Sequence, residues 1–157
     1  NNEKPLRVEE LLNEIEKPEH WLEGAYFNQD ITDANLFFAQ LPNSIFEGLS
    51  VKKIIFNNSN LEGSIFRSSQ LNEVSFLNCN LKNANFDATS FVHKKESVLD
   101  FSDSELGGIT FSGADRCTLK LSGITMSSPT SINYFLNSDI FETKTGDSEP
   151  QTIFFLA

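Results

Sequence analysis

The chain has 157 residues, of which 39% are hydrophobic, and this is enough for one domain with an apolar core. Its two cysteines are too few for a disulfide framework, and no apolar run approaches the ~18 residues that a membrane-spanning helix needs. The formal net charge is −10, but residues 26–91 carry six acids and four bases, so the centre is nearly balanced. This distribution argues against an acidic central surface that imitates nucleic acid.

Residues 1–20 predict a helical cap at the start of the domain. Val8, Leu11, Leu12 and Ile15 follow helical spacing within residues 6–16, with acids on the other face, and Pro18 ends the helix. An amphipathic helix of this kind also suggests membrane or partner binding. An anionic membrane would repel its glutamates, which favours the interpretation as a cap.

From Trp21 onward, large apolar residues recur at every fifth position. The series is Trp21, Tyr26, Ile31, Leu36, Leu41, Phe46, Val51, Phe56, Leu61, Phe66, Leu71, Phe76, Leu81, Phe86 and Phe91. This spacing fits neither an α-helix nor an ordinary alternating strand. The residue two before each centre is often small, and it should face inward with the centre because residues two apart in extended chain point the same way. These small residues are Ala34, Ala39, Ser44, Ser59, Ser64, Ser69, Cys79, Ala84 and Thr89.

Four segments resemble the Ala-Asp/Asn-Leu-X-X pattern of the pentapeptide-repeat family. They are Ala34-Asn35-Leu36, Ser59-Asn60-Leu61, Cys79-Asn80-Leu81 and Ala84-Asn85-Phe86. The resemblance covers residues 21–91 well and residues 99–126 loosely. It implies an all-β fold, a right-handed quadrilateral parallel β-helix of about five coils in which residues twenty apart stack. Leu41, Leu61 and Leu81 should form one column and Phe46, Phe66 and Phe86 the next, while Ile31, Val51 and Leu71 should lead to Phe91 and Phe111.

The register returns after Phe91 but skips two positions, Glu96 and Arg116. Because these lie twenty residues apart, they predict two bulges on one face, at Val92–Val98 and Asp115–Thr118, above the column of Leu36, Phe56 and Phe76. The bulges carry His93, Lys94, Lys95, Glu96, Asp115 and Arg116. They are either plain loop insertions or a charged recognition patch, since binding residues collect on loops of rigid scaffolds.

Phe27 and Phe37 come one residue after a centre and Phe38 comes two residues after one, so their side chains are predicted to point outward. Exposed phenylalanines could anchor a protein partner, which makes Phe37 and Phe38 candidate binding residues. They could equally lie beneath the N-terminal helix. The apolar face of that helix must pack against other apolar side chains, which favours the second interpretation.

Residues 127–157 lose the five-residue period, so the β-helix is expected to span residues 21–126. Ile132, Tyr134 and Leu136 alternate like a strand, and a turn at 145–147 precedes the apolar residues 153–156. The interpretation is a C-terminal hairpin cap or a linker into a following domain. The apolar end and the start without Met predict a segment of a larger protein, and a C-terminal strand that packs on its own domain is the alternative.

No catalytic site, metal site or cofactor is predicted. His20 and His93 have no ligand at zinc spacing, and there is no Gly-rich phosphate loop and no basic patch with aromatics. Cys79 occupies an inward position and should be core. Cys117, in the second predicted bulge, should be more exposed, but no base is assignable to it.

The phenylalanine-rich coils and helical ends also resemble the N-terminal β-helix domain of bacterial HECT-like E3 ubiquitin ligase effectors. That resemblance implies a non-catalytic module that recruits host proteins, such as those of the ubiquitin system, in an effector delivered by type III secretion whose later domain is the ligase. No signal-peptide pattern opens the chain. The alternative resemblance, to gyrase-protection proteins of the quinolone-resistance type, implies a DNA mimic and a homodimer. The near-balanced centre, the interruptions and the helical N-terminus count against it, and a structural repeat protein of another role is a third interpretation.

Overall fold

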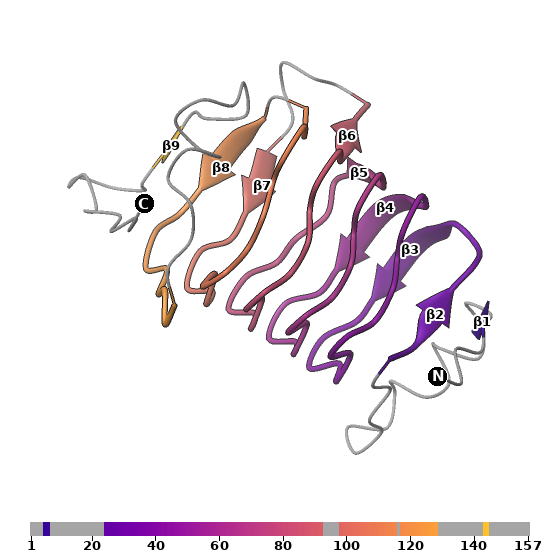
Figure 1. The fold of residues 1–157 in the computed structure, drawn as a ribbon, viewed down its shortest axis with the longest axis horizontal. Helices are drawn as coiled ribbons and strands as arrows, with labels where there is room; N and C mark the ends of the chain where they lie inside the picture. Colours follow the sequence, from indigo (N-terminus) through magenta and orange to yellow (C-terminus); the bar gives the residue numbers. More distant parts are fainter. Residues whose placement is uncertain (1–4, 7–23, 93–97, 116, 129–142, 145–157) are drawn as a thin grey trace.

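The computed structural model describes residues 5–6, 24–92, 98–115, 117–128 and 143–144, and their regular structure is entirely β (Figure 1). The strands in chain order are β1 (Pro5–Leu6), β2 (Tyr26–Phe27), β3 (Ile31–Asn35), β4 (Ser50–Ile55), β5 (Gln70–Asn72), β6 (Ser90–Phe91), β7 (Val98–Asp100), β8 (Thr118–Lys120) and β9 (Thr143–Lys144).

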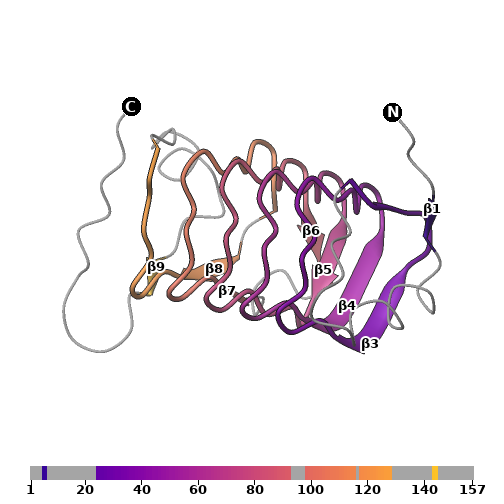
Figure 2. The ribbon, with the colours of Figure 1, turned by 90° about the horizontal axis from the view of Figure 1, so that it is seen from below.

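The strands stack in parallel from one coil to the next, so that the chain winds along a single axis (Figures 1 and 2). One sheet has the order β3-β4-β5-β6, a second has the order β7-β8-β9, and β1 pairs with β2. Ile31 pairs with Val51, Val51 with Leu71, and Leu71 with Phe91. The predicted parallel β-helix of five-residue repeats is confirmed.

Four repeats complete one coil and give the β-helix four faces, each named here by its column of inward centres. Face 1 has Ile31, Val51, Leu71 and Phe91; face 2 has Leu36, Phe56, Phe76, Phe101 and Leu121; face 3 has Leu41, Leu61, Leu81 and Leu106; face 4 has Phe27, Phe46, Phe66, Phe86 and Phe111. All of these side chains are buried, as are all nine of the small residues predicted to face inward.

The polar residues of the repeat form the corners between faces. The second residue after a centre has positive φ, for example Asn58 (63°) and Gly63 (69°). Asn and Gly tolerate this left-handed conformation better than other residues, which explains their frequency there. Most turns are closed by the N–H of the next inward residue, which donates to the C=O of the preceding centre, as from Ser59 to Phe56 (3.1 Å).

The phenylalanines of faces 2 and 4 form two ring columns that meet inside the coil. The rings of Phe46 and Phe66 stack with centroids 4.6 Å apart, and Phe66 and Phe86 follow at 4.9 Å. Phe56 and Phe76 each meet Phe66 edge-on, at 5.8 and 5.5 Å. Stacked and edge-to-face contacts are both favourable, so the core gains from each coil added.

The first repeat departs from the predicted register by one residue. Tyr26 pairs with Ile45, nineteen residues on, and the ring of Phe27 stacks on Phe46 at 4.5 Å. The prediction of Tyr26 as a centre and Phe27 as an outward residue is therefore wrong: Tyr26 is partly exposed and Phe27 is buried. Ile31 is the fourth residue after Phe27, whereas successive centres are normally five residues apart, so the chain reaches the next face one residue early.

The second correction concerns the interruptions after Phe91. Asn60 pairs with Asn80 at twenty residues, Asn80 with Glu105 at twenty-five, and Glu105 with Thr125 again at twenty. Five residues are thus inserted once, between Val92 and Val98, and the predicted second bulge is wrong because Asp100 pairs with Lys120 in normal register. The insertion lies at the corner between faces 1 and 2. It shifts the later columns, so Phe111 stacks on Phe86 and not on Phe91.

Both predicted caps lie mainly outside the described residues. Of the predicted helix over residues 6–16, only Leu6 is described, and it belongs to strand β1, which pairs with β2. At the other end, β9 pairs in parallel with β8, so residues 143–144 continue the stacking of the coils. The predicted hairpin segments at 132–136 and 153–156 lie outside the described residues.

Candidate partner-binding surface

The structure describes three of the eight predicted binding residues. His93, Lys94, Lys95, Glu96 and Arg116 lie outside the described residues. Asp115 is partly exposed on face 1, where its N–H donates to the C=O of Thr89 (2.8 Å). Phe37 and Phe38 are exposed on face 2, at the opposite end of the described coils from Asp115, so the structure does not bring these predicted residues together.

Three large apolar side chains form an exposed cluster at the start of face 2, and we call it the aromatic patch. Phe37 is 43% exposed, Phe38 62% and Ile55 37%. Ile55 is the pairing partner of Asn35, and Phe37 follows Asn35 by two residues, so Ile55 and Phe37 are diagonal neighbours on the outer surface of adjacent coils. Diagonal neighbours of this size are within reach of one another. The patch therefore spans two coils.

Phe38 occupies a backbone position that suits it poorly. Its φ is 57°, and the residues stacked on it along face 2 are Asn58, Asn78, Asp103 and Gly123, all with positive φ. Asn, Asp and Gly adopt this conformation more readily than a bulky aromatic residue, for which it costs roughly 1–2 kcal/mol. Phe38 also leaves most of its ring in water. Neither property helps the fold.

Two lysines lie beside the patch, on the corner that connects face 1 to face 2. Lys52 and Lys53 are exposed residues of β4, the same strand that ends with Ile55. Lys53 lies in a row between Asp33 and Glu73, whereas the row of Lys52 contains the uncharged Thr32 and Asn72. Neither lysine makes an ion pair with a described residue. The five-residue insertion is located at this same corner, two coils further on, between the described residues Val92 and Val98.

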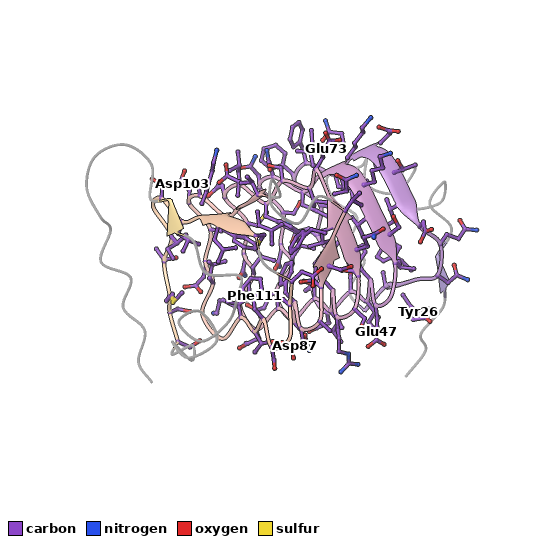
Figure 3. The ribbon with its side chains drawn as sticks, turned by 90° about the horizontal axis from the view of Figure 1, so that it is seen from above. Tyr26, Glu47, Glu73, Asp87, Asp103 and Phe111 are labelled. Carbon is purple, nitrogen blue, oxygen red and sulfur yellow. The ribbon has the colours of Figure 1, made fainter. Side chains whose placement is uncertain are left out.

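Charges on the other faces are interleaved. On face 4, Arg67 bridges to Glu47 of the preceding coil, and Asp87 occupies the next place in the row. On face 3, Lys82 lies 3.9 Å from Glu62. Figure 3 shows Glu47 and Asp87 on one side of the β-helix and Glu73 and Asp103 on the other. Over the described residues, therefore, acids do not form an unbroken stripe and bases do not form an extended patch.

The two thiols are buried and unsuited to nucleophilic chemistry. Cys79 is in the core, as predicted, but Cys117 is buried as well, which contradicts its predicted exposure. Burial raises the pKa of each thiol to about 12, and for Cys117 the nearby charge of Asp115 adds to the effect. The described residues contain no cluster of His, Cys, Asp and Glu that could hold a metal ion. Nor do they include a helix with the length and apolar character needed to cross a membrane.

The sequence analysis found Phe37 and Phe38 but missed Ile55 and the two lysines. Ile55 directly precedes a centre, at a position that faces outward. Its companions in the row, Asn35 and Ser75, are polar. An isoleucine among polar residues at an outward position was the available signal.

The comparisons with known proteins agree with this architecture. Residues 54–91 match the family model described as pentapeptide repeats, in eight copies, so this stretch is a run of pentapeptide repeats. A comparison with curated proteins found no match. Two solved structures of trypsin-treated variants of QnrB1, a plasmid-mediated fluoroquinolone resistance protein, are similar to the chain. They have TM-scores of 0.57 and 0.51 at 19% and 18% identity, each over 66% of this chain and over 53% and 51% of theirs. The chain thus spans about half of those proteins, and the likeness is one of fold.

Proposed function

We propose that this chain is a non-catalytic module that binds a protein partner on the outside of its β-helix. The observation that carries the proposal is the aromatic patch. The scaffold buries all its other described phenylalanines, yet Phe37 and Phe38 are exposed together beside two lysines that form no ion pair with a described residue. Clustered aromatic side chains on a rigid surface are typical of binding hot spots.

The recruitment of host proteins in a secreted effector is the finer form of this proposal. It rests on the sequence resemblance to the β-helix domain of HECT-like E3 ligase effectors. The aromatic patch supports the recruiting role. In that form of the proposal the thioester chemistry belongs to another part of a longer protein, because the described thiols are buried.

Gyrase binding by DNA mimicry is the second candidate, and the fold shared with QnrB1 is the observation in its favour. A DNA mimic needs acids in unbroken rows that follow the spacing of phosphates. In the described coils the row of Glu47 is interrupted by Arg67 and the row of Glu62 by Lys82. The charge pattern therefore favours recruitment through apolar contacts.

The test is photo-crosslinking from defined positions of the full chain. Benzoylphenylalanine placed at Phe38 is expected to capture a protein from host-cell extract, and the same residue at Lys120, on face 2 but four coils away, is not. The captured protein is then purified and titrated against the unmodified chain. If positions on all four faces capture nothing that binds on titration, the proposal fails. Purified gyrase whose affinity falls steeply with salt would instead support the second candidate.

The ligase form has its own test on any longer protein that contains this chain. Incubation with ubiquitin, activating enzyme and charged conjugating enzyme is expected to give a reducible ubiquitin adduct on a non-reducing gel. Without an adduct the ligase form is lost, while binding by the patch is unaffected.

A further inference from the structure

We infer that the aromatic patch, together with Lys52 and Lys53, is a docking surface for an acidic amphipathic helix of a partner protein. The inference rests on the proposed function and specifies the partner's chemistry. Phe38 supplies the first reason. Asn stands at the equivalent place in the next two coils, so the fold has a better occupant for this position than the one it carries.

The backbone of the patch indicates that docking uses side chains. The N–H of Leu36 donates to the C=O of Ile55 (2.8 Å), and the N–H of Phe38 donates to the C=O of Asn57 (3.2 Å). The N–H of Phe37 donates to Oδ1 of Asn35 (3.2 Å). Because these donors are already used, a partner cannot add a strand to them. A helix needs no such donors, and its side chains at i and i+4 lie ~6 Å apart, close to the ~4.8 Å spacing of coils, so two of them can straddle the patch.

Charge specifies the rest of the partner. Lys52 and Lys53 flank the apolar side chains and have no ion pair within the described residues, so carboxylates beside the partner's apolar row would meet them. Asp33 and Glu73 offset part of the charge of Lys53, which leaves Lys52 as the main contact. An anionic membrane or a nucleic acid carries negative charge over an extended surface. The protein has a net charge of −10 and is repelled by such a surface. A short acidic helix presents only a few charges, all within about one Debye length of the lysines.

The experiment measures binding of two fluorescein-labelled 14-residue peptides to the full chain by anisotropy. Both have leucine at i, i+3, i+4 and i+7 and alanine elsewhere, except at three positions beside the leucine row, which hold glutamate in one peptide and lysine in the other. The glutamate peptide is expected to bind at least tenfold more tightly. Phe38→Asn should weaken its binding at least tenfold. Lys52→Glu combined with Lys53→Glu should weaken it about fivefold at low salt and less at high salt.

Lys120→Glu is the control, because it makes the same substitution at one exposed lysine three coils from Lys52 and Lys53, and it should leave binding unchanged. Phe38→Asn must keep or raise the melting temperature, so lost binding cannot reflect unfolding. Equal binding of the two peptides, or no effect of Phe38→Asn, overturns the inference.

Two further outcomes assign the patch to another occupant. If the glutamate peptide binds only after Leu11→Asp and Ile15→Asp, the patch is covered by the chain's own N-terminal segment. If vesicles with 30% phosphatidylserine bind and neither peptide does, the surface faces a membrane. Either outcome overturns the inference. A crosslinked protein partner that binds Phe38→Asn as tightly as wild type would also overturn it, yet leave the proposed function intact.

Discussion

Face 3 and the corner between faces 1 and 2 use the same five-residue repeat for different purposes. On face 3 the leucine column is unbroken and the outer row alternates Asn43, Gly63, Asn83 and Gly108, all with positive φ. At the corner and the adjoining patch, a phenylalanine takes a place that suits asparagine, two lysines have no ion pair among the described residues, and five residues are inserted. The comparison teaches that the repeat tolerates substitution at its outer positions as long as its inward positions are kept.

The alternation on face 3 has a steric cause. A Cβ at Gly63 would fall on Oδ1 of Asn43, and one at Gly108 would fall on Oδ1 of Asn83. Each Asn therefore leans over a coil that has no side chain beneath it. In the aromatic patch no Asn side chain leans over a glycine of the adjacent coil. The two surfaces therefore differ in whether the outer side chains of adjacent coils pack on one another.

The largest expected effect separates the core from both surfaces. Phe66 contacts the rings of Phe46, Phe56, Phe76 and Phe86, so Phe66→Ala should lower the free energy of unfolding by about 3–5 kcal/mol. Urea denaturation measures the change, and Phe37→Ala, on the exposed patch, is the control with a small effect. A loss below about 1 kcal/mol for Phe66→Ala would contradict the packing described.

The thiols test whether the corner is packed as densely as face 3, because Cys79 lies on face 3 and Cys117 at the corner. Each pKa is raised to about 12 from an ordinary value of 9.0, so the folded state keeps protons that the unfolded state loses. Stability should be unaffected below pH 9 and should fall above it, on the order of 1 kcal/mol per thiol for each pH unit up to about 12.

Iodoacetamide at pH 8 provides the readout for each site. Both thiols should react at least a hundredfold more slowly in the native protein than in urea. Rapid alkylation of Cys117 alone would show that the corner opens where face 3 does not.

Two glycines sharpen the steric part of the comparison. Gly63→Ala and Gly48→Ala both place Ala at positive φ, which costs about 1 kcal/mol each. Gly63→Ala must also turn Asn43 aside, whereas Gly48 has nothing within 4 Å of its Cβ position. We expect a total of about 2 kcal/mol for Gly63→Ala, measured by thermal denaturation. Equal losses would show that the Asn–Gly alternation has no steric role.

Two inward serines differ only in their hydrogen bonds. Oγ of Ser59 donates to the C=O of Leu36 (2.8 Å) and accepts from the N–H of Ala39 (3.1 Å), while Oγ of Ser64 has no hydrogen-bond partner. Ser59→Ala should therefore cost about 1 kcal/mol and Ser64→Ala nothing, or it should stabilise. Paired urea titrations compare them, and a larger loss for Ser64→Ala would refute this assignment.

The smallest expected effect has the opposite sign. Phe38→Asn should raise the free energy of unfolding by about 1 kcal/mol, because Asn suits the positive φ and the exposed ring is removed. Asn58→Phe, the reverse change one coil further along the same row, is the control and should destabilise by more than this amount, because it also removes the acceptor of the hydrogen bond from Nδ2 of Asn78 (2.7 Å). If Phe38→Asn destabilises the protein, Phe38 contributes to the fold and not to a binding surface.

The sequence predicts the period of five well and the period of twenty less well. A centre must be large and apolar, so the columns up to Phe91 can be counted directly. An insertion of five residues leaves that count in phase, and it is revealed by pairings between residues twenty-five apart, such as Asn80 with Glu105. Tyr26 and Phe27 are both aromatic, so the pattern could not choose between them. Phe37 and Phe38 were predicted from position alone, but the left-handed backbone that makes Phe38 unusual depends on the turn in three dimensions.

The position of the insertion has a consequence for the shape of any long partner. Had those five residues been wound into the coil as a fifth side, everything after them would be rotated by a quarter turn about the axis. Their centre position holds Glu96, a carboxylate that is costly to bury, and Asp100 keeps its place above Ser75. Phe38 and Asp103 are consequently collinear, three coils or ~14 Å apart. A rod-like partner that lies lengthwise on face 2 can therefore touch both ends without bending.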